Sequence, residues 1–400
     1  MISVEEARQR VLAGIGPVPD EQIGIAQAVG RVLAQDVRAR VSHPPVAVSS
    51  MDGYAVRATD VATVPAELAL IGESAAGRAF PGSLNPGQAV RIFTGAPMPY
   101  GADAVVMQEN TRKGEGTVTI LESVRAGHFV RPAGLDFAVG DAPLKAGRRL
   151  GARDVGLIAA MNVPWIMVKR PPRVAILSTG DELVMPGEPI GPSQIIGSNG
   201  LALAAFVTAM GGEATILGTA LDSEESLRAM TAGARGADLL VTSGGASVGD
   251  YDLVQSALDD IGLRVDFYKV AMRPGKPLMF GSIGEVPVLG VPGNPVSALV
   301  CAYMFLGPAL RKMVGLPAEV GTVPAILGRD LGANDRRQDH LRATLSHRAD
   351  GALVATPFDR QDSAMMAGLA LADCLVVRAA FAPAARAGEP VDVIPLSEGR

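Results

Sequence analysis

Cysteine is scarce in this sequence: Cys301 and Cys374 are the only two in 400 residues. They form no C-x-x-C pair, which argues against a disulfide framework and against a zinc knuckle. Aromatic residues make up only 4% of the chain, too few to predict stacking surfaces for single-stranded nucleic acid. The net charge of −5 disfavours a phosphate backbone as a binding partner. We therefore expect no nucleic-acid partner.

Long apolar runs and a leader-like N-terminus are also missing. The most apolar stretches, residues 201–210 and 296–306, are too short to span a bilayer. Residues 1–10 mix acidic and basic side chains and lack the apolar segment of a signal peptide. With 48% hydrophobic and 19% charged residues, the composition is that of a globular protein. We expect a cytoplasmic protein with no membrane partner.

Several enzyme motifs are absent as well. The sequence contains no G-x-x-x-x-G-K-[ST] ATPase loop, and no G-x-G-x-x-G follows the first strand of its α/β region. No H-E-x-x-H occurs among the four histidines. The two C-terminal histidines lie among arginines and aspartates. They could form a basic face with the arginines, but for most of these residues we expect a solvated edge with the aspartates as partners. Its residues are His340, His347, Arg336, Arg337, Arg342, Arg348, Asp335, Asp339 and Asp350.

The residues that are present predict a multidomain α/β protein. Residues 44–140 show short strand-like runs separated by Gly, Pro and Asn, which predicts a β-rich lobe. Residues 171–316 alternate strand-like and helical runs, which predicts a doubly wound, mostly parallel sheet with helices on both faces. Residues 317–400 again alternate in short runs, and predict a small β sandwich or barrel.

The remaining residues predict a helical, linking domain. Residues 1–43 and 141–170 form it, and residues 1–18 could instead pack on the α/β domain. Within it, residues 20–33 have the spacing of a second helix, or of a helix with a strand.

Residues 241–252 (Val-Thr-Ser-Gly-Gly-Ala-Ser-Val-Gly-Asp-Tyr-Asp) form the most informative stretch. They follow a short apolar run and precede residues with helical spacing. A strand that ends in glycines and opens a helix suits an anion, because backbone N–H groups and the helix N-terminus face it. Asp250 and Asp252 in the same turn suggest an intervening cation, most simply Mg²⁺. The alternative is an ordinary glycine-rich turn with Asp252 as a helix N-cap.

Five loops follow predicted strands of the α/β region, and in a doubly wound sheet such loops share one crevice. They carry acids that suit a metal ion, and cations and amides that suit oxyanions. This set predicts a phosphate-bearing substrate handled with Mg²⁺, with charge neutralisation as the main catalytic device. Each residue also has a plainer interpretation as a cap, a turn residue or a surface pair. The residues are Asp181, Glu182, Asp222, Asp250, Asp252, Arg273, Lys276, Asn294 and Ser297.

Several motifs together resemble the molybdopterin molybdenumtransferase family, a bacterial enzyme family whose eukaryotic relatives include the large domain of gephyrin. The likeness extends over nearly the whole chain, and the motifs stand in the family's order. They are residues 50–56, 94–99, 101–106, 178–183, 243–252, 273–277 and 292–297.

The resemblance implies the final step of molybdenum cofactor biosynthesis. Adenylated molybdopterin and molybdate would be the substrates, Mg²⁺ would assist, and AMP would leave as the metal enters the dithiolene. The resemblance also implies a homodimer in which the β-rich lobe of one subunit completes the α/β crevice of the other. Molybdopterin adenylyltransferase and acceptor molybdoenzymes would be further partners. Molybdenum and tungsten both stay open as the delivered metal.

The resemblance further implies roles for individual residues, with those of the lobe acting in the partner subunit's crevice. Molybdate would lie near Lys276, Ser297, Arg342 and Ser363. The implied catalytic residues are Asp52, Thr94, Glu182, Asp222, Asp252, Lys269, Arg273 and Lys276, with Glu182, Asp222 and Asp252 as Mg²⁺ ligands. The implied binding residues are Asp136, Thr179, Gly180, Ser198, Asn199, Ser243, Gly244, Gly245, Ser247, Gly249, Pro292, Asn294, Ser297, Arg342 and Ser363.

Two positions depart from the family's pattern. Arg273 stands where many relatives carry lysine, so a planar fork replaces a point charge. The sequence around Ser363 is Gln361-Asp362-Ser363-Ala364, where many relatives have Gly-Ser-Gly. The carboxylate of Asp362 therefore stands beside a residue expected to bind an oxyanion.

Two other functions compete with this interpretation. The α/β region alone also looks like molybdopterin adenylyltransferase, which makes the adenylated substrate, but the β-rich lobe and the C-terminal β domain argue for the later step. A non-catalytic scaffold is the other alternative, since relatives bind membrane-receptor tails through the same fold. The acids at Glu182, Asp222 and Asp252 argue against a purely structural role.

Overall fold

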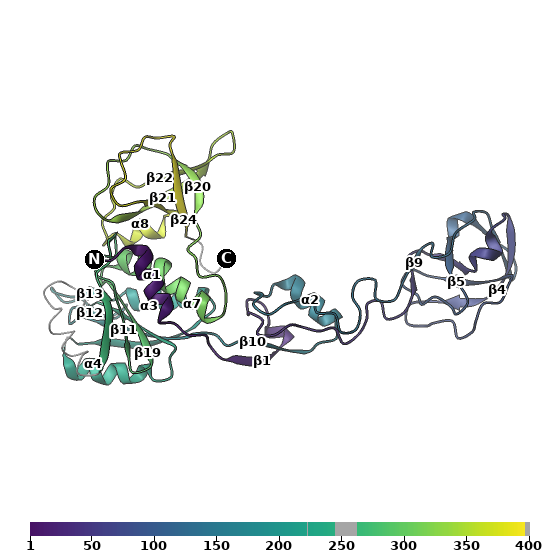
Figure 1. Ribbon diagram of the computed structural model, residues 1–400, viewed down its shortest axis with the longest axis horizontal. Coiled ribbons are helices and arrows are strands. Elements are labelled where there is room, and N and C mark those ends of the chain that lie inside the picture. The colour runs from purple at the N-terminus through teal and green to yellow at the C-terminus, as the bar shows by residue number, and fades with distance from the viewer. Residues whose placement is uncertain (222, 245–261, 397–400) are drawn as a thin grey trace. The chain divides into compact units, whose positions relative to one another are not determined.

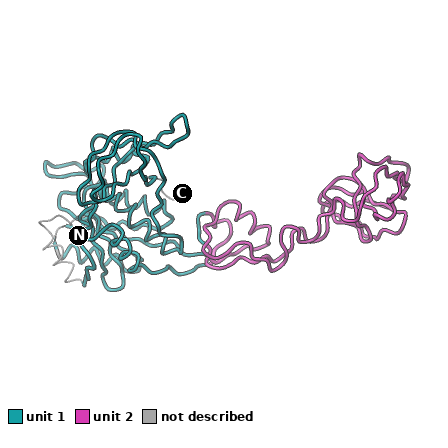
Figure 2. The backbone as a smooth tube through the Cα atoms, turned by 45° about the horizontal axis from the view of Figure 1, so that its top comes forward, with its two compact units in different colours: residues 1–21, 30–32, 168–400 teal, residues 22–29, 33–167 magenta. Residues whose placement is uncertain are grey.

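The computed structural model describes residues 1–221, 223–244 and 262–396. The chain forms two compact units, which Figure 2 shows in different colours. Unit 1 comprises Met1–Glu21, Gly30–Val32 and Val168–Arg400. Unit 2 comprises Gln22–Val29 and Leu33–Met167.

Unit 2 contains a six-stranded sheet with the strand order β6-β3-β5-β4-β8-β7. Val56, Val106, Val118 and Ile120 belong to one buried cluster of this sheet. β3 and β6 approach closely at Gly53, where a Cβ atom would lie 1.9 Å from the carbonyl oxygen of Val106. A larger residue at Gly53 would therefore separate the two strands. The strands of this sheet are β3 (Gly53–Val56), β4 (Ala66–Ser74), β5 (Gln88–Ile92), β6 (Ala104–Met107), β7 (Thr111–Lys113) and β8 (Thr117–Ile120). Strands β2 (Val48–Ser49) and β9 (Val130–Arg131) pair with each other in a separate two-stranded sheet.

For residues 20–33 of the linking region the sequence predicts either a second helix or a helix with a strand, and the structure has the strand but no α-helix. Strand β1 (Asp20–Gly24) is followed by a single 3-10 turn at Ile25–Gln27. The physical reason lies in Gly24, because a glycine inside a helix costs about 1 kcal/mol relative to alanine. Further along this region lie helix α2 (Ala152–Ala160) and strand β10 (Trp165–Lys169).

Unit 1 contains a second six-stranded sheet, with the order β14-β11-β15-β19-β18-β16. Figure 1 labels β11 and β19 of this sheet. The pairs β11–β14, β11–β15 and β15–β19 are parallel, while β18 pairs antiparallel with both β19 and β16. The sheet is therefore mostly parallel with an antiparallel edge, as the alternating sequence pattern predicts. The strands are β11 (Arg173–Thr179), β14 (Glu213–Ala220), β15 (Leu239–Ser243), β16 (Leu263–Tyr268), β18 (Met279–Ile283) and β19 (Val286–Val291).

Both faces of this sheet are covered. On β11, Val174 and Ile176 belong to one buried cluster, whereas Ala175 and Leu177 belong to another. Successive strand residues point to opposite faces, so each face has its own core. Helix α1 (Val4–Ala13) contributes to the first cluster; the hydroxyl of its N-cap Ser3 accepts a hydrogen bond from the Glu6 N–H at 3.1 Å. The other helices of this region are α3 (Asn199–Ala209), α4 (Glu224–Thr231), α6 (Pro295–Cys301) and α7 (Gly307–Met313).

A long helical stretch lies in the core of unit 1. α6 and α7 are joined by a π-helical turn at Ala302–Leu306, so the whole stretch runs over Pro295–Met313. It is the one helix of the described residues that is long and apolar enough to cross a membrane by length and composition. Its most apolar window is 78% buried inside the fold, as befits a core helix.

The C-terminal strands close into a barrel. β21 pairs with both β22 and β23, and β22-β20-β24-β23 completes the ring, so the predicted sandwich or barrel is a barrel. Strand β17 (Met272–Arg273) comes from the α/β region and pairs parallel with the start of β21. The elements of the barrel are β20 (Val323–Leu327), β21 (Gln338–His347), β22 (Leu353–Pro357), α8 (Met366–Ala370), β23 (Cys374–Arg378) and β24 (Pro390–Pro395).

Candidate functional site

Three strand-end loops of unit 1 meet at one edge of the sheet. Ser178 is in register with Ser243, and Ser243 is in register with Val291, so the ends of β11, β15 and β19 are neighbours. Asn199 at the start of α3 ties two of these loops together. Its Nδ2 donates to Ser243 Oγ at 2.8 Å and to the Gly293 carbonyl at 2.7 Å. The convergence predicted for a doubly wound sheet is therefore present for these loops.

Two glycines let the loops approach closely. Gly244 has φ +103°, and a Cβ atom there would lie 2.3 Å from the Thr179 carbonyl oxygen. Gly180 has φ +140°, and a Cβ atom would lie 2.5 Å from Glu182 Oε2. Both positions need the backbone freedom of glycine. The carboxylate of Glu182 thus folds back over the turn that follows β11.

Thr179 carries an unpaired polar group into this edge. Its residue is 4% exposed, and its Oγ1 has no hydrogen-bond partner in the described part of the chain. A buried hydroxyl without a partner is unfavourable by about 1–3 kcal/mol, so such groups often mark a ligand site. Pro292 is buried beside this edge, whereas Ser198 is exposed. Ser198 precedes α3, but its side chain makes no capping hydrogen bond.

Several predicted residues lie outside the described residues. They include two of the three acids expected to hold Mg²⁺ and most of the glycine turn. Glu182 is the only one of those three acids that the structure describes, and it is exposed. Among the described residues, no group of three His, Cys, Asp or Glu side chains could hold a metal ion. The residues outside are Asp222, Gly245, Ser247, Gly249, Asp250 and Asp252.

Arg273 faces the barrel through its guanidinium. Its Nε donates to Asp339 Oδ1 at 2.8 Å, and its Nη2 also contacts the Asp339 carboxylate. Further bonds reach Asn334 Oδ1 at 3.2 Å and Asp335 Oδ2 at 3.3 Å. The hydrogen bond to Asp339 raises the pKa of Arg273. These contacts engage Nε, Nη1 and Nη2 within the protein, while the Arg273 side chain stays 45% exposed.

Residues 269–276 form a cationic loop, which contains Lys269, Arg273 and Lys276. Lys276 is half-buried, and its ammonium group makes no hydrogen bond or ion pair to any residue that the structure describes. Its carbonyl accepts from the N–H groups of Val270 and Leu278, each at 3.0 Å. Lys269 has φ +79°, and its Nζ lies 5.1 Å from the centroid of the Tyr268 ring. Lys276 is therefore the cation that this loop offers to an anion.

Arg342 is buried rather than part of a solvated edge, which corrects the interpretation of residues 335–350. Its residue is 1% exposed, and desolvation lowers its pKa. Its Nη1 donates to the Met365 carbonyl at 2.8 Å, its Nη2 to the Asp362 carbonyl at 2.9 Å, and its Nε to Gln361 Oε1 at 3.3 Å. The guanidinium thus holds the loop at residues 360–365 in place through hydrogen bonds to its carbonyl groups.

The loop held by Arg342 reaches the start of α6. Asn294 Nδ2 donates to Ser363 Oγ at 3.0 Å, and the Val296 N–H donates to the Ser363 carbonyl at 3.1 Å. Ser297 is 5% exposed, in the first turn of α6. Ser363, Asn294 and Ser297 therefore come together, with Arg342 supporting them. The structure also buries His340, at 1% exposure, although its sequence surroundings predict a solvated edge.

Asp52 and Thr94 meet in unit 2. Asp52 Oδ1 accepts hydrogen bonds from the Thr94 N–H at 2.7 Å and from its hydroxyl at 2.8 Å. These two bonds lower the pKa of Asp52. Asp136 is exposed on the same unit, where its N–H donates to the His43 carbonyl at 3.0 Å. The Asp52–Thr94 pair therefore presents the exposed carboxylate of Asp52 in a fixed orientation.

Sequence reasoning missed Asp339 as a structural partner. Its residue is only 5% exposed, although the pattern indicated a surface pair. Arg273 and Asp339 are 66 residues apart, and no local spacing links them.

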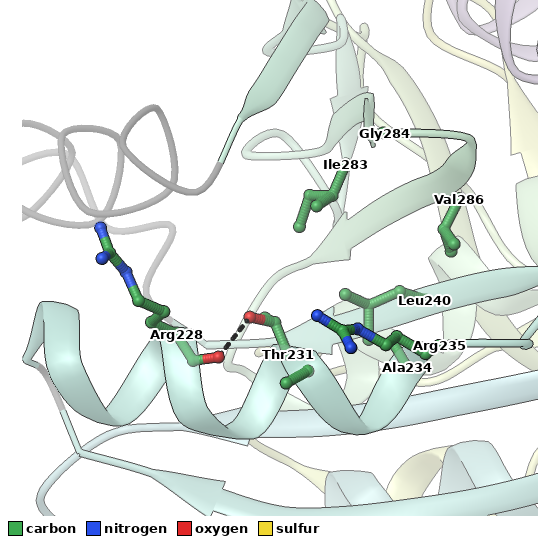
Figure 3. A pocket seen from close by; sticks show the side chains of 9 residues that line it. Arg228, Thr231, Ala234, Arg235, Leu240, Ile283, Gly284 and Val286 are labelled. Carbon is green, nitrogen blue, oxygen red and sulfur yellow. Dashed lines mark hydrogen bonds between the residues drawn. The ribbon is translucent and has the colours of Figure 1, made fainter.

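A pocket of 460 Å³ lies away from the strand-end loops (Figure 3). Leu240 and Val286 line it near the N-terminal ends of β15 and β19, opposite the edge that carries Ser243 and Val291. At its rim the Thr231 hydroxyl donates to the Arg228 carbonyl at 3.2 Å. No described residue predicted for the site lines this pocket, so its volume is not a guide to the chemistry.

Three family comparisons cover most of the chain. Residues 2–162 match the MoeA N-terminal region (domain I and II). Residues 175–312 match a probable molybdopterin binding domain. Residues 324–396 match the MoeA C-terminal region (domain IV).

Relatives and solved structures agree with these matches. A molybdopterin molybdenumtransferase of Nostoc sp. is 40% identical over 83% of this chain and 78% of the relative. One of Haemophilus influenzae is 33% identical over 99% of both chains. A crystal structure described as molybdopterin biosynthesis moea protein of Pyrococcus horikoshii has a TM-score of 0.89, with 31% identity over 99% of both chains.

Proposed function

The chain belongs to the molybdopterin molybdenumtransferase family, and from this premise we propose how its residues carry out the transfer. The activity is insertion of molybdenum into molybdopterin, the final step of molybdenum cofactor biosynthesis, with molybdopterin and molybdate as substrates. We propose further that the molybdopterin is adenylated and that AMP leaves during the transfer. The observation that carries this proposal is the edge at which the loops after Thr179, Ser243 and Val291 meet.

The cationic loop supports binding of the anionic substrate. The Lys276 ammonium group would hold a phosphate or molybdate oxygen, because no described residue neutralises it. The Thr179 hydroxyl would bind the same ligand through its unused hydrogen-bonding capacity. A charge-assisted hydrogen bond is roughly twice as strong as a hydrogen bond between neutral groups. Together they would orient the phosphoanhydride for displacement of AMP by molybdate oxygen.

One described carboxylate supports a Mg²⁺ site at this edge. Glu182 places a carboxylate over the Gly180 turn, and hard oxygen ligands are what Mg²⁺ prefers. Glu182 would hold the ion together with Asp222 and Asp252. When bound, Mg²⁺ would neutralise charge on the phosphoanhydride and on the departing AMP. Asn199 keeps the loops around it in place through Ser243 and Gly293.

Arg342 and Ser363 have separate roles in this proposal. Arg342 supports the loop at residues 360–365, whereas Ser363 faces Asn294 at the start of α6 and would meet molybdate there. In a homodimer, Asp52 and Thr94 would act in the crevice of the partner subunit, as the resemblance implies. Cytoplasmic localisation and contacts with molybdopterin adenylyltransferase and acceptor molybdoenzymes belong to the same proposal.

The test is an assay with purified protein, adenylated molybdopterin, molybdate and Mg²⁺. We expect AMP release and active cofactor, and for Lys276→Ala a loss of about 100-fold in rate, because one preorganised charge is removed from the transition state. Lys145→Ala, which removes an exposed ion pair with Asp36 in unit 2, is the matched control and should keep its rate. Undiminished AMP release by Lys276→Ala would refute the assignment. With ATP and molybdopterin alone, no adenylated product should form.

A further inference from the structure

The loop that carries Lys276 is held by the barrel as well as by its own domain. Strand β17 pairs with β21, so that Met272 faces Gln338 and Arg273 faces Asp339 in register. The Gln338 N–H also donates to the Ala271 carbonyl at 2.9 Å. The main chain just before Lys276 is therefore part of the C-terminal sheet.

Side chains reinforce this attachment at one point. Asp339 is 5% exposed, and its carboxylate receives both Nε and Nη2 of Arg273. A bidentate pair fixes the orientation of both partners, which a single contact does not. By contrast, Asp335 has a side chain that is 45% exposed, and it is shared between Arg273 and Arg337. Asp339 is thus the anchor of Arg273, and Asp335 is an accessory contact.

The far end of the same loop is pinned as well. Gly275 has φ +113°, and a Cβ atom there would lie 2.8 Å from the Sγ atom of Cys301 in α6. Between the two anchors, the N–H groups of Val270 and Leu278 close on the Lys276 carbonyl. The backbone of Lys276 is consequently fixed from both sides, and on the barrel side the Arg273–Asp339 pair adds to the main-chain pairing.

We propose that Asp339 is a positioning residue for the transfer reaction: by holding Arg273 it sets the position of the Lys276 ammonium group, without touching substrate. This inference rests on the proposed function of Lys276. It assigns the C-terminal barrel a direct part in the site of the α/β region. It also explains how arginine serves at position 273, since only a planar fork binds Asp339 through two nitrogens.

The test compares Asp339→Asn with Asp335→Asn in the full-length protein. Asp339→Asn keeps the side-chain shape but loses the charge that holds Arg273. We expect it to raise the Kd for adenylated molybdopterin about tenfold and to speed amide exchange at Val270 and Leu278 about tenfold. Asp335→Asn should leave both within about twofold, because exposed pairs contribute little. Asp339→Glu should restore part of the affinity.

A combined variant separates positioning from mere stability. If Asp339 acts through Lys276, then Lys276→Ala should weaken binding much less in the Asp339→Asn background than in the wild type. Additive losses, or unchanged exchange at Val270 and Leu278, would overturn the inference. If the wild type bound adenylated molybdopterin without releasing AMP, the proposed function would fail, yet the Kd values would still decide the role of Asp339.

Discussion

At the scale of single residues, burial decides what a charged or titratable side chain can do. The sequence places Arg342 and His340 in one polar run, which is typical of a solvated edge. The structure buries both, and Arg342 then uses its donors on backbone carbonyls instead of on solvent. Nothing local in the sequence distinguishes these two from exposed His347, because burial comes from the closure of the barrel.

His340 leads to a pH prediction. Burial lowers its pKa from 6.5 to about 4, so the folded protein keeps it neutral while the unfolded chain takes up a proton below pH 6.5. Stability from this group is therefore complete above pH 6.5 and falls as the pH drops towards 4. Between pH 7 and pH 5 we expect a loss of about 2 kcal/mol.

The measurement is the free energy of unfolding in denaturant at both pH values. His340→Gln should show a smaller fall than the wild type, even if it is less stable throughout. His347→Gln, at an exposed position of the same strand, controls for loss of a histidine. Equal falls for the wild type and His340→Gln would contradict the prediction.

At the scale of elements, the sequence predicts the parallel strands well and their partners poorly. Strands buried on both faces appear as apolar runs, so β11, β15 and β19 stand out. β17 does not, because it is short and pairs with a strand whose sequence is distant. Its role follows from the register of Arg273 with Asp339, which only the folded chain brings together.

The turn after β15 gives an element-scale prediction. Gly244→Ala would place a methyl group against the Thr179 carbonyl and would also strain a backbone at φ +103°. Gly211→Ala shares the positive φ, but its Cβ would meet no atom within 4 Å. We expect Gly244→Ala to lower the free energy of unfolding by about 2 kcal/mol more than Gly211→Ala does.

Denaturant unfolding of the two variants measures that difference. Calorimetric titration with adenylated molybdopterin should show weaker binding for Gly244→Ala, since the edge at Thr179 is displaced. Equal free energies of unfolding for the two variants would contradict the prediction, because the turn at Gly244 would then accept a methyl group without displacing Thr179.

At the scale of the whole molecule, each unit holds only part of the predicted set. Glu182, Lys276 and Thr179 lie in unit 1, and the Asp52–Thr94 pair lies in unit 2. In the homodimer that the resemblance implies, the residues of unit 2 in one subunit would complete the site in unit 1 of the other. Neither composition nor periodicity predicts such an arrangement, because an interface leaves no regular spacing in the sequence.

Mixed dimers test that arrangement. Asp52→Ala and Lys276→Ala should each be nearly inactive alone. After subunit exchange in equal amounts, about a quarter of the sites should combine two intact halves, so about a quarter of wild-type AMP release should return. Lys276→Ala mixed with Glu182→Ala should recover nothing, because both changes lie in unit 1. No recovery in the first mixture, with dimers shown by light scattering, would refute a shared site.

The Thr179 hydroxyl has no hydrogen-bond partner among the described residues, and this has an energetic consequence for ligand recognition. The empty protein already bears the desolvation penalty of that group, about 1–3 kcal/mol. A ligand that supplies the missing hydrogen bond removes this penalty. Part of its binding free energy therefore comes from the penalty that the unliganded protein carries. Replacing the hydroxyl with a methyl group would then raise the stability of the unliganded protein and lower its affinity for the ligand.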